Sequence, residues 1–371
     1  MPSLYDPVKV GVLRLKNGIC MAPMARARND TDRTPTPMMA EYYAQRATAG
    51  LIVTEANSIS PMSQSRPHAA AHYLDAQTEG WRMVAAAVHD AGGTIFQQIY
   101  HLGRKSDPSR MPDGLAPISA SAIAASGQVA GKNGPVEFTT PRSIETEEIP
   151  IIVDQFRQAA ERARQAGMDG VEIHGANAYL IDQFLKSATN QRTDGYGGAP
   201  ENRCRFLFEV VDAVSAVFGP ERVGVRVSPH SRGDGIGDSN LPALYNCVAK
   251  GLAARQIAYL HLVECDGPGL PQSPAEHTPA ILPIVRESFP GTLIVCGGYT
   301  RESAEQIVAD ARADMVAFAT LYISNPDLVA RFQKKTPLND GDRSTFLNGD
   351  GEGYIDYRTL EAKGNLADAS G

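Results

Sequence analysis

The chain has 371 residues, of which 43% are hydrophobic and 21% charged, and its formal net charge at pH 7 is −7. This composition is typical of a globular protein with a large core. The negative charge argues against a nucleic acid or an anionic membrane as partner, because both attract an excess of cationic side chains. No apolar run reaches the roughly 18 residues of a spanning helix, and the N-terminus has no leader pattern. We therefore expect a cytoplasmic protein.

Repeated strand and helix patterns follow one another along the chain. Residues 1–17 contain two short alternating runs, which predict a β-hairpin. Eight apolar runs typical of buried strands follow at residues 18–22, 51–55, 94–98, 170–174, 223–227, 259–262, 293–296 and 315–318. Each precedes a helical pattern, at residues 37–49, 76–91, 150–166, 201–217, 242–256, 278–288, 301–312 and 325–334. Eight such units in series predict an α/β fold, a closed (β/α)8 TIM barrel with the hairpin plugging its N-terminal end.

An open doubly wound sheet is the alternative, since periodicity does not reveal closure. It is disfavoured because no Gly-x-Gly-x-x-Gly turn follows the first strand. No linker interrupts the pattern, so residues 1–371 are predicted to form one domain. Residues 103–149 are too long for an ordinary connection after the third strand, and we expect them to cap the catalytic face. The tail, residues 359–371, has little apolar surface and is expected to be disordered.

The five cysteines lie too far apart for a zinc or iron–sulfur clamp, and no metal site is expected. We interpret them as reduced thiols with a structural role, since several end or adjoin apolar runs. They are Cys20, Cys204, Cys247, Cys265 and Cys296.

Polar or glycine residues end several predicted strands. Gln98 ends the third, His174 the fourth, Arg226 is near the end of the fifth, and Gly297-Gly298 follow the seventh. Each alone has an ordinary structural explanation. Because the active site of such a barrel lies at the C-terminal ends of its strands, together they predict one site.

The segment from His174 to Tyr179 carries the clearest chemical pattern. His174 and Asn177 are three residues apart, so in a turn both can donate to one carbonyl or anionic oxygen. Tyr179 can act as a proton donor, because a phenol is protonated at neutral pH. A ring that only packs, with its hydroxyl in solvent, is equally compatible with the spacing.

Five segments resemble successive motifs of the Old Yellow Enzyme family of FMN-dependent ene reductases, in particular the pentaerythritol tetranitrate and N-ethylmaleimide reductase branch. They are Met21-Ala-Pro-Met-Ala-Arg26, Gln98-Ile-Tyr-His-Leu-Gly-Arg104, His174-Gly-Ala-Asn-Ala-Tyr179, Asn190-Gln-Arg-Thr-Asp-Gly-Tyr-Gly-Gly198 with Glu201-Asn-Arg203, and Arg226-Val-Ser-Pro229. The similarity runs from about residue 3 to Tyr357. It implies FMN at the barrel mouth, reduction by NADPH or NADH, and hydride transfer to the activated C=C bond of an enone or nitroalkene, or reduction of a nitrate ester.

The resemblance also implies a role for each site residue. His174 and Asn177 hold the activating oxygen of the substrate, and Tyr179 protonates its α-carbon. Gln98 and Arg226 bind the flavin edge. The remaining implied contacts are Pro23, Met24 and Ala56 with the flavin ring, Gly297, Gly298 and the 319–320 pair with its phosphate, and Tyr100, Arg66, Arg142 and Tyr354 with the substrate. The small-molecule substrate is the only partner implied, and the protein is expected to be a monomer or a homodimer.

Two positions depart from the family pattern. Ala25 stands where a Thr or Cys usually donates to flavin O4, and Ala319-Thr320 stand where Gly-Arg usually grips the phosphate. Weaker FMN retention is expected, because a charge-assisted contact is worth more than a neutral one. The alternative is therefore a non-redox, isomerase-like barrel that keeps the His174, Asn177 and Tyr179 clamp but has weakened or lost FMN binding.

Overall fold

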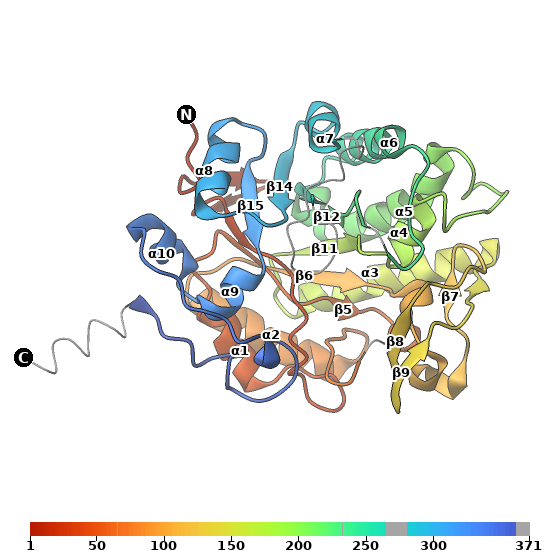
Figure 1. Cartoon of the computed structure of the whole chain (residues 1–371), viewed down its shortest axis with the longest axis horizontal. Coiled ribbons are helices and arrows are strands. Elements are labelled where there is room, and N and C mark those ends of the chain that lie inside the picture. The colour runs from red at the N-terminus through yellow and green to blue at the C-terminus, as the bar shows by residue number, and fades with distance from the viewer. Residues whose placement is uncertain (65, 232, 265–279, 361–371) are drawn as a thin grey trace, which may run out of the picture.

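The computed structural model describes residues 1–64, 66–231, 233–264 and 280–360. Its central feature is a parallel β-barrel surrounded by helices (Figure 1). The barrel strands are β3 (Ile19–Met21), β4 (Leu51–Val53), β6 (Ile95–Tyr100), β11 (Gly170–Gly175), β12 (Val223–Val227), β13 (Tyr259–Val263), β14 (Thr292–Cys296) and β15 (Met315–Phe318). Each pairs in parallel with the next, and β15 pairs with β3, so the sheet closes. The predicted (β/α)8 barrel is confirmed.

The helices begin and end close to the predicted ranges. The main ones are α1 (Pro37–Ala44), α2 (Asp75–Asp90), α3 (Ile149–Gln165), α5 (Pro200–Phe218), α6 (Leu241–Ala254), α7 (Leu282–Ser288), α8 (Arg301–Ala309) and α10 (Leu328–Lys334). Side-chain caps fix some of these ends, because an oxygen satisfies a free N–H of the first turn. Asn240 caps α6 and Thr300 caps α8 in this way. No helix in the described ranges is long and apolar enough to cross a lipid bilayer.

The first helix differs from its prediction. It ends at Ala44 instead of reaching residue 49. Just beyond it, the fully buried Arg46 donates to the carbonyls of Tyr322 at 2.9 Å and Ile323 at 2.8 Å. Periodicity favoured a longer helix, but a buried guanidinium must satisfy its donors, and here the acceptors lie on the last βα unit.

Several short elements fall in segments that carried no periodic signal. They are α4 (Leu180–Leu185), α9 (Thr320–Ser324), β5 (Asn57–Ser58), β7 (Ile118–Ser119), β8 (Gln128–Gly131), β9 (Gly134–Glu137) and β10 (Arg142–Ser143). Segments of two to six residues are too short to show a helix or strand period. The predicted tail lies outside the described residues from position 361 onward.

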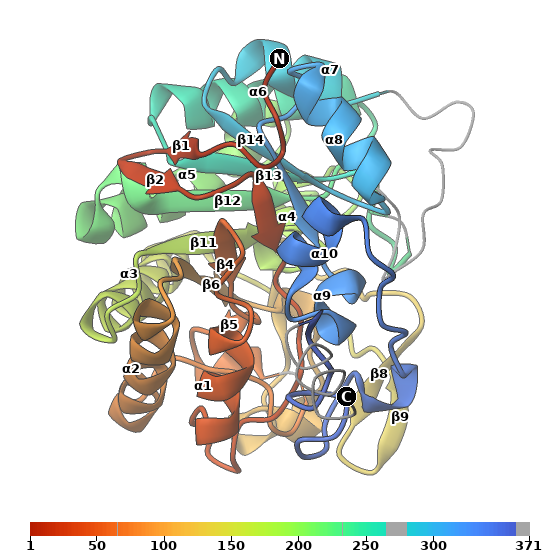
Figure 2. The ribbon, with the colours of Figure 1, turned by 90° about the vertical axis from the view of Figure 1, so that its left-hand side faces the viewer.

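The N-terminal hairpin is present, formed by β1 (Val8–Val10) and β2 (Leu13–Leu15). Val10 and Leu15 are buried in the same apolar cluster as Phe96, Tyr259 and Met315 from the barrel strands. The hairpin therefore closes one end of the barrel interior, as predicted. The β8–β9 hairpin of the 103–149 insertion lies on the opposite side of the molecule (Figures 1 and 2).

A glycine opens space for the largest side chain inside the barrel. In the strand register, Gly224 of β12 lies between Glu172 of β11 and Tyr259 of β13. A Cβ at Gly224 would overlap the Tyr259 ring. Without it, the tyrosine crosses its neighbouring strand and its hydroxyl donates to Glu172 Oε2 at 3.1 Å.

Changing Gly224 to Ala is therefore expected to displace Tyr259 and lower the free energy of unfolding by about 1–3 kcal/mol, the usual cost of overpacking a core. Urea unfolding followed by circular dichroism measures it. Gly92, whose Cβ would meet no atom within 4 Å, has a positive φ of 72°, so Gly92→Ala controls for backbone strain alone. If Gly224→Ala were no more destabilising than Gly92→Ala, the packing argument would be wrong.

Candidate functional site

The strand register brings the predicted polar residues together near the C-terminal ends of three adjacent strands. His174 of β11 lies beside Arg226 of β12, and one inward-facing level deeper Gln98 of β6 lies beside Glu172 of β11. All four are almost completely buried. The fold therefore brings together residues that are far apart in the sequence. Gln98 and Arg226 are 128 positions apart.

His174 is a neutral hydrogen-bond donor. Its side chain is 4% exposed, and its Nδ1 accepts the N–H of Ala176 at 3.2 Å. The proton of the neutral ring is therefore on Nε2. Burial, helped by the nearby cation Arg226, lowers the pKa of His174 to about 3. The ring thus offers an Nε2–H without carrying a charge.

Two aromatic side chains pack around this imidazole. The Tyr179 ring is stacked on His174 with 4.5 Å between ring centroids. Tyr100 lies 5.3 Å from Tyr179 and 6.4 Å from His174, again between centroids. The ammonium of Lys105, in the insertion, lies 5.7 Å from the centre of the Tyr179 ring. The phenol predicted as proton donor thus lies against the predicted oxygen-binding histidine.

The loop that carries Asn177 is held in an unusual backbone conformation. Asn177 and Ala178 have φ values of +56° and +62°, the left-handed region that residues with a Cβ rarely occupy. Ser228 Oγ accepts the Asn177 N–H at 2.7 Å, and Asp182 Oδ2 accepts the Ala178 N–H at 2.9 Å. These bonds offset the local strain, which costs of order 1–3 kcal/mol for such residues. The side chain of Asn177 is exposed.

A buried lysine links this loop to the one after β12. Lys186 is fully buried and donates from Nζ to the carbonyls of Ser228 at 2.9 Å and Pro229 at 3.1 Å. Its Nζ also lies 3.6 Å from Asp182 Oδ1. The loops after β11 and β12 are therefore fixed relative to each other. No role was predicted for Asp182, Lys186 or Ser228, although Ser228 lies in the Arg226–Pro229 motif, because the local pattern does not show which loops their side chains join.

The residues assigned to the flavin have the properties that a cofactor site requires. Arg226 is 7% exposed, and its Nε has no hydrogen-bond partner among the described residues. Gln98 donates from Nε2 to Glu172 at 2.6 Å, which leaves its carbonyl oxygen as the acceptor. Gly297 and Gly298 have φ values of 140° and 71°, so the chain turns sharply after β14. An unpaired guanidinium donor, an amide acceptor and a glycine turn match the donors and acceptors of a flavin with its phosphate.

The open positions around these residues fit the same interpretation. The barrel strands are buried throughout, apart from the half-buried Thr292 that begins β14, whereas the residues assigned to the flavin just beyond them are half-buried or exposed. These are Pro23, Met24, Ala25, Ala56, Gly297, Gly298, Ala319 and Thr320. Ala319 precedes α9, and Thr320 is its first residue. Their contacts with FMN remain predictions.

Three of the residues assigned to the substrate lie in other environments. Arg142 is exposed and forms an ion pair with Glu148, Nη1 to Oε2 at 2.6 Å. Tyr354 is fully buried and stacks on Tyr42 with 4.0 Å between centroids. Arg66 is half-buried, and its carbonyl accepts a bond from Arg33 at 3.2 Å. Their contact with a substrate remains a prediction, as does that of Tyr100.

Tyr354 belongs to a segment that buried arginines attach to the barrel. Arg26 donates to the carbonyls of Phe346 at 2.8 Å and Gly353 at 2.9 Å. Arg28 donates to Asp350 O at 2.9 Å, and its guanidinium lies 4.3 Å from the centre of the Tyr354 ring. The arginines thus fix this segment next to the first two barrel loops.

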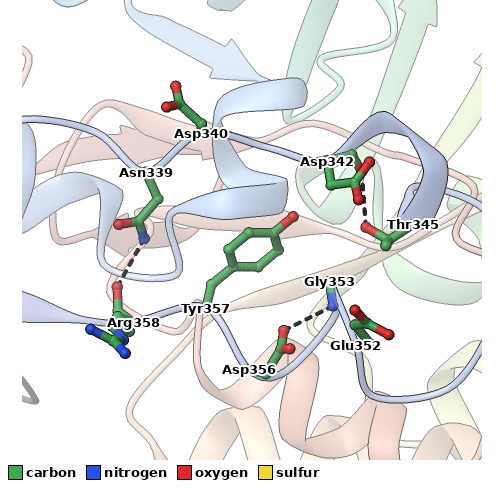
Figure 3. Close-up of a pocket in the computed structure, with 9 residues that line it drawn as sticks. All are labelled: Asn339, Asp340, Asp342, Thr345, Glu352, Gly353, Asp356, Tyr357 and Arg358. Carbon is green, nitrogen blue, oxygen red and sulfur yellow. Dashed lines mark hydrogen bonds between the residues drawn. The ribbon is translucent and has the colours of Figure 1, made fainter.

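A pocket of about 330 Å³ lies within the same segment (Figure 3). Its lining includes four carboxylates, Asp340, Asp342, Glu352 and Asp356. Two of its loops are closed by hydrogen bonds, from Asn339 Nδ2 to Arg358 O at 2.9 Å and from Gly353 N to Asp356 Oδ1 at 2.8 Å. None of the predicted site residues lines this pocket, so it is separate from the candidate active site.

A buried network below the site was also missed from the sequence. Glu172 accepts bonds from Gln98 at 2.6 Å and Tyr259 at 3.1 Å, and it bonds His261 Nδ1 at 2.9 Å. Although burial opposes both charges, the pKa of Glu172 is lowered by His261, and the pKa of His261 is raised by Glu172. The signal was present, because Tyr259 and His261 are two apart in a strand and so face the same side.

The environment of His174 predicts that its imidazole does not change protonation state near neutral pH. A nuclear magnetic resonance titration of the imidazole, assigned by comparison with His174→Asn, should show no inflection between pH 5 and 8, because only the neutral ring is tolerated. Since its folded pKa of about 3 lies below the roughly 6.5 of an unfolded chain, protonation favours unfolding. Stability from this ring is therefore lost as pH falls below 6.5. An inflection near pH 6.5 would show that His174 is solvated.

Comparisons with known proteins agree with this geometry. A model of the "NADH:flavin oxidoreductase / NADH oxidase family" matches residues 3–339. The chain is 43% identical to 12-oxophytodienoate reductase 1 of Oryza sativa subsp. japonica over 361 residues, covering 96% of this chain and 93% of that protein. It is 44% identical to the structure of morphinone reductase in complex with tetrahydroNAD, with a TM-score of 0.91 and 97% and 98% of the two chains covered. The old yellow enzyme homologue from Zymomonas mobilis is 40% identical, with a TM-score of 0.92 and 97% and 100% covered. The chain therefore belongs to the Old Yellow Enzyme family of NADH:flavin oxidoreductases.

Proposed function

We propose that this flavin oxidoreductase uses FMN and NADPH or NADH to reduce the activated C=C bond of α,β-unsaturated carbonyl or nitro compounds. The observation that carries the proposal is the neutral, buried His174, with Tyr179 stacked on it and the unpaired donor of Arg226 on the neighbouring strand. The names of the relatives, 12-oxophytodienoate reductase and morphinone reductase, refer to oxo compounds and agree with a carbonyl as the activating group.

His174 is suited to binding the oxygen that becomes negative during reduction. FMN, when bound and reduced by NAD(P)H, supplies the hydride. The Nε2–H of His174 donates to the activating oxygen of the substrate, and the amide of Asn177 provides a second donor. The bond from Ala176 orients the His174 ring, and the bond to Ser228 fixes the backbone that carries Asn177, so the two donors are placed to stabilise the enolate-like charge more than the neutral ground state. A neutral imidazole also avoids repulsion with Arg226.

Tyr179 completes the reaction by moving a proton. Its ring lies against His174, so its phenol is within reach of a substrate whose oxygen the histidine holds. The phenol donates its proton to the α-carbon of the substrate. Lys105, close to the same ring, stabilises the phenolate that remains. We assign donation, and not packing alone, to this tyrosine, and its place beside the oxygen-binding histidine supports that role.

FMN binding separates this function from the non-redox alternative. We expect the purified protein to bind one FMN noncovalently, with flavin absorbance and a Kd measurable by fluorescence quenching. Thr320→Arg should tighten binding roughly tenfold or more, because it adds a charge-assisted contact near the phosphate. Thr320→Val is the matched control without a charge. If the protein did not bind FMN even when FMN was in excess, the non-redox, isomerase-like alternative would be favoured and the proposal would be overturned.

Tyr179→Phe keeps the packing of the ring and removes the acid. FMN content and reduction by NAD(P)H should stay near the wild-type values, and enone turnover should fall about 10²- to 10⁴-fold, the usual contribution of general acid catalysis. The two half-reactions are measured separately by stopped-flow absorbance. Nitroalkenes should be slowed much less, because their nitronate product leaves without α-protonation. Equal slowing of both substrate classes would mean that Tyr179 positions the substrate instead of protonating it.

A further inference from the structure

Cys296 lies at the floor of the candidate site, at the end of β14 and directly before Gly297. It is 8% exposed, whereas the interior of its strand is completely buried. Its Sγ lies 3.8 Å from Arg226 Nη2, the side chain assigned to the flavin edge. The sulfur is therefore a direct neighbour of the guanidinium that we assign to the flavin edge, and the proposed reaction does not use it.

A histidine and a carboxylate stand behind this thiol. Glu172 Oε2 bonds Nδ1 of His261 at 2.9 Å, which directs the ring. Nε2 of His261 has no conventional hydrogen-bond partner among the described residues, and the thiol of Cys296 is the acidic group that interacts with it. Glu172, His261 and Cys296 thus follow the order of a carboxylate, an imidazole that it holds in its charged form, and a thiol that this charge favours as thiolate.

The electrostatics favour the thiolate at this position. Burial alone would raise the pKa of the Cys296 thiol, but His261 and Arg226 together lower it below the ordinary value. The titratable and charged groups around it are His261 on β13, Arg226 on β12, Cys20 on β3 and Tyr299 in the loop after β14. Glu172 on β11 stands behind His261.

Cys20 is a natural internal comparison for Cys296. In the register, both cysteines pair with Ala317 of β15, one from each side. They are therefore at the same level of the barrel, and their Cα atoms are separated by two strand spacings, about 9–10 Å. This distance is too long for a disulfide. Cys20 is completely buried, and burial raises its pKa well above the ordinary value. Depth in the barrel alone therefore does not activate a thiol.

We propose that Cys296 is a nucleophilic thiol that forms a covalent adduct with soft electrophiles, including activated alkenes, when no FMN covers it. Only the covering by FMN rests on the proposed function. The thiol gives up its proton to solvent, His261 and Arg226 stabilise the thiolate, and the thiolate sulfur forms a bond to the β-carbon of the alkene. The π electron pair moves to the carbonyl oxygen, and the α-carbon then receives the proton. The product is a thioether, and no oxidant or reductant is consumed.

The proposal has a consequence for the enzyme. An alkene of the class proposed as substrate becomes a covalent inhibitor of a molecule that has lost its flavin, because the adduct occupies the floor of the cofactor site. Thr320 and Ala25, which replace two family contacts to FMN, make such molecules more frequent. FMN thereby protects Cys296, and the alkylated protein does not rebind FMN.

N-ethylmaleimide tests this directly. The whole protein, purified with its bound flavin, is diluted until FMN dissociates and is treated at pH 7 with and without excess FMN. Each cysteine is quantified by peptide mass spectrometry, which separates Cys296 from Cys247 on the outer helix α6. We expect the adduct at Cys296 to form at least about tenfold faster than at Cys20, and excess FMN to slow it about tenfold or more.

His261→Gln tests the activating role of the histidine. It should slow alkylation of Cys296 at pH 7 about tenfold and move the pH profile of the reaction upward, because the thiolate loses its partner. A purely structural role would not move that profile. Circular dichroism and labelling of Cys20 report on folding, since a loosened barrel exposes Cys20. The pH profile of the wild-type protein gives the same information without any substitution, as its midpoint should lie below the roughly 8.5 of a free thiol.

The outcomes separate this proposal from the proposed function. If Cys296 reacts rapidly but FMN never binds, the thiol proposal stands and the ene-reductase proposal fails. If FMN binds, and Cys296 in the flavin-free fraction reacts no faster than Cys20, the thiol proposal is overturned and the ene-reductase proposal stands. A wild-type pH midpoint at or above that of a free thiol would also overturn it.

Discussion

One buried carboxylate, that of Glu172, organises the polar interior of this barrel. It sits in a completely buried strand and is hydrogen-bonded to Gln98 on β6 and to Tyr259 and His261 on β13. A buried charge is tolerated only when it is paired and hydrogen-bonded, and removal of one partner of such a pair typically costs about 3–5 kcal/mol. The strands that carry these partners are therefore constrained to one register. Gly224 belongs to the same constraint, because it leaves the space through which Tyr259 reaches the carboxylate.

The same constraint orients the residues at the site. Gln98 donates a hydrogen bond from its amide nitrogen to Glu172, and its carbonyl oxygen is left to accept a bond. His174 lies two residues after Glu172 on the same strand, so it faces the same side one level higher. Burial keeps it neutral, and Arg226, its neighbour on β12, adds to this effect. Glu172 and its partners thus support, one level higher, the neutral donor of His174 beside the cation of Arg226, where a developing negative charge is stabilised.

Two further sets of hydrogen bonds hold the loops above the barrel. Asp182 on α4 holds the left-handed backbone at Ala178, and Lys186, directly after α4, holds the loop that follows β12. Arg26 and Arg28 attach the segment around Gly353 to the other side of the mouth. Both sets of bonds join charged side chains to backbone carbonyls or N–H groups. They are strong because such bonds are charge-assisted and shielded from water.

Much of the architecture was predictable from the sequence, because it depends on periodicity. Eight apolar runs and their helices predicted the closed barrel, and the alternating N-terminal runs predicted the hairpin, whose Val10 and Leu15 fill the barrel end. The strand ends at Gln98, His174 and Arg226 were recognisable as well, because the topology places strand C-termini together. The first helix was predicted too long, since periodicity does not register the acceptors that Arg46 finds on a distant segment.

The sequence by itself determined the fold, the position of the site and the residue types in it, because these follow from local pattern and strand order. Only the tertiary structure decided which titratable side chains lie close enough to influence each other's charge. Glu172, His261 and Cys296 are up to 124 positions apart, and no spacing in the sequence joins them. The pairing of β11 through β14 brings them together inside the barrel, and burial then makes each charge depend on the others. Such coupling is a property of distance and solvent exclusion, which the order of residues does not contain.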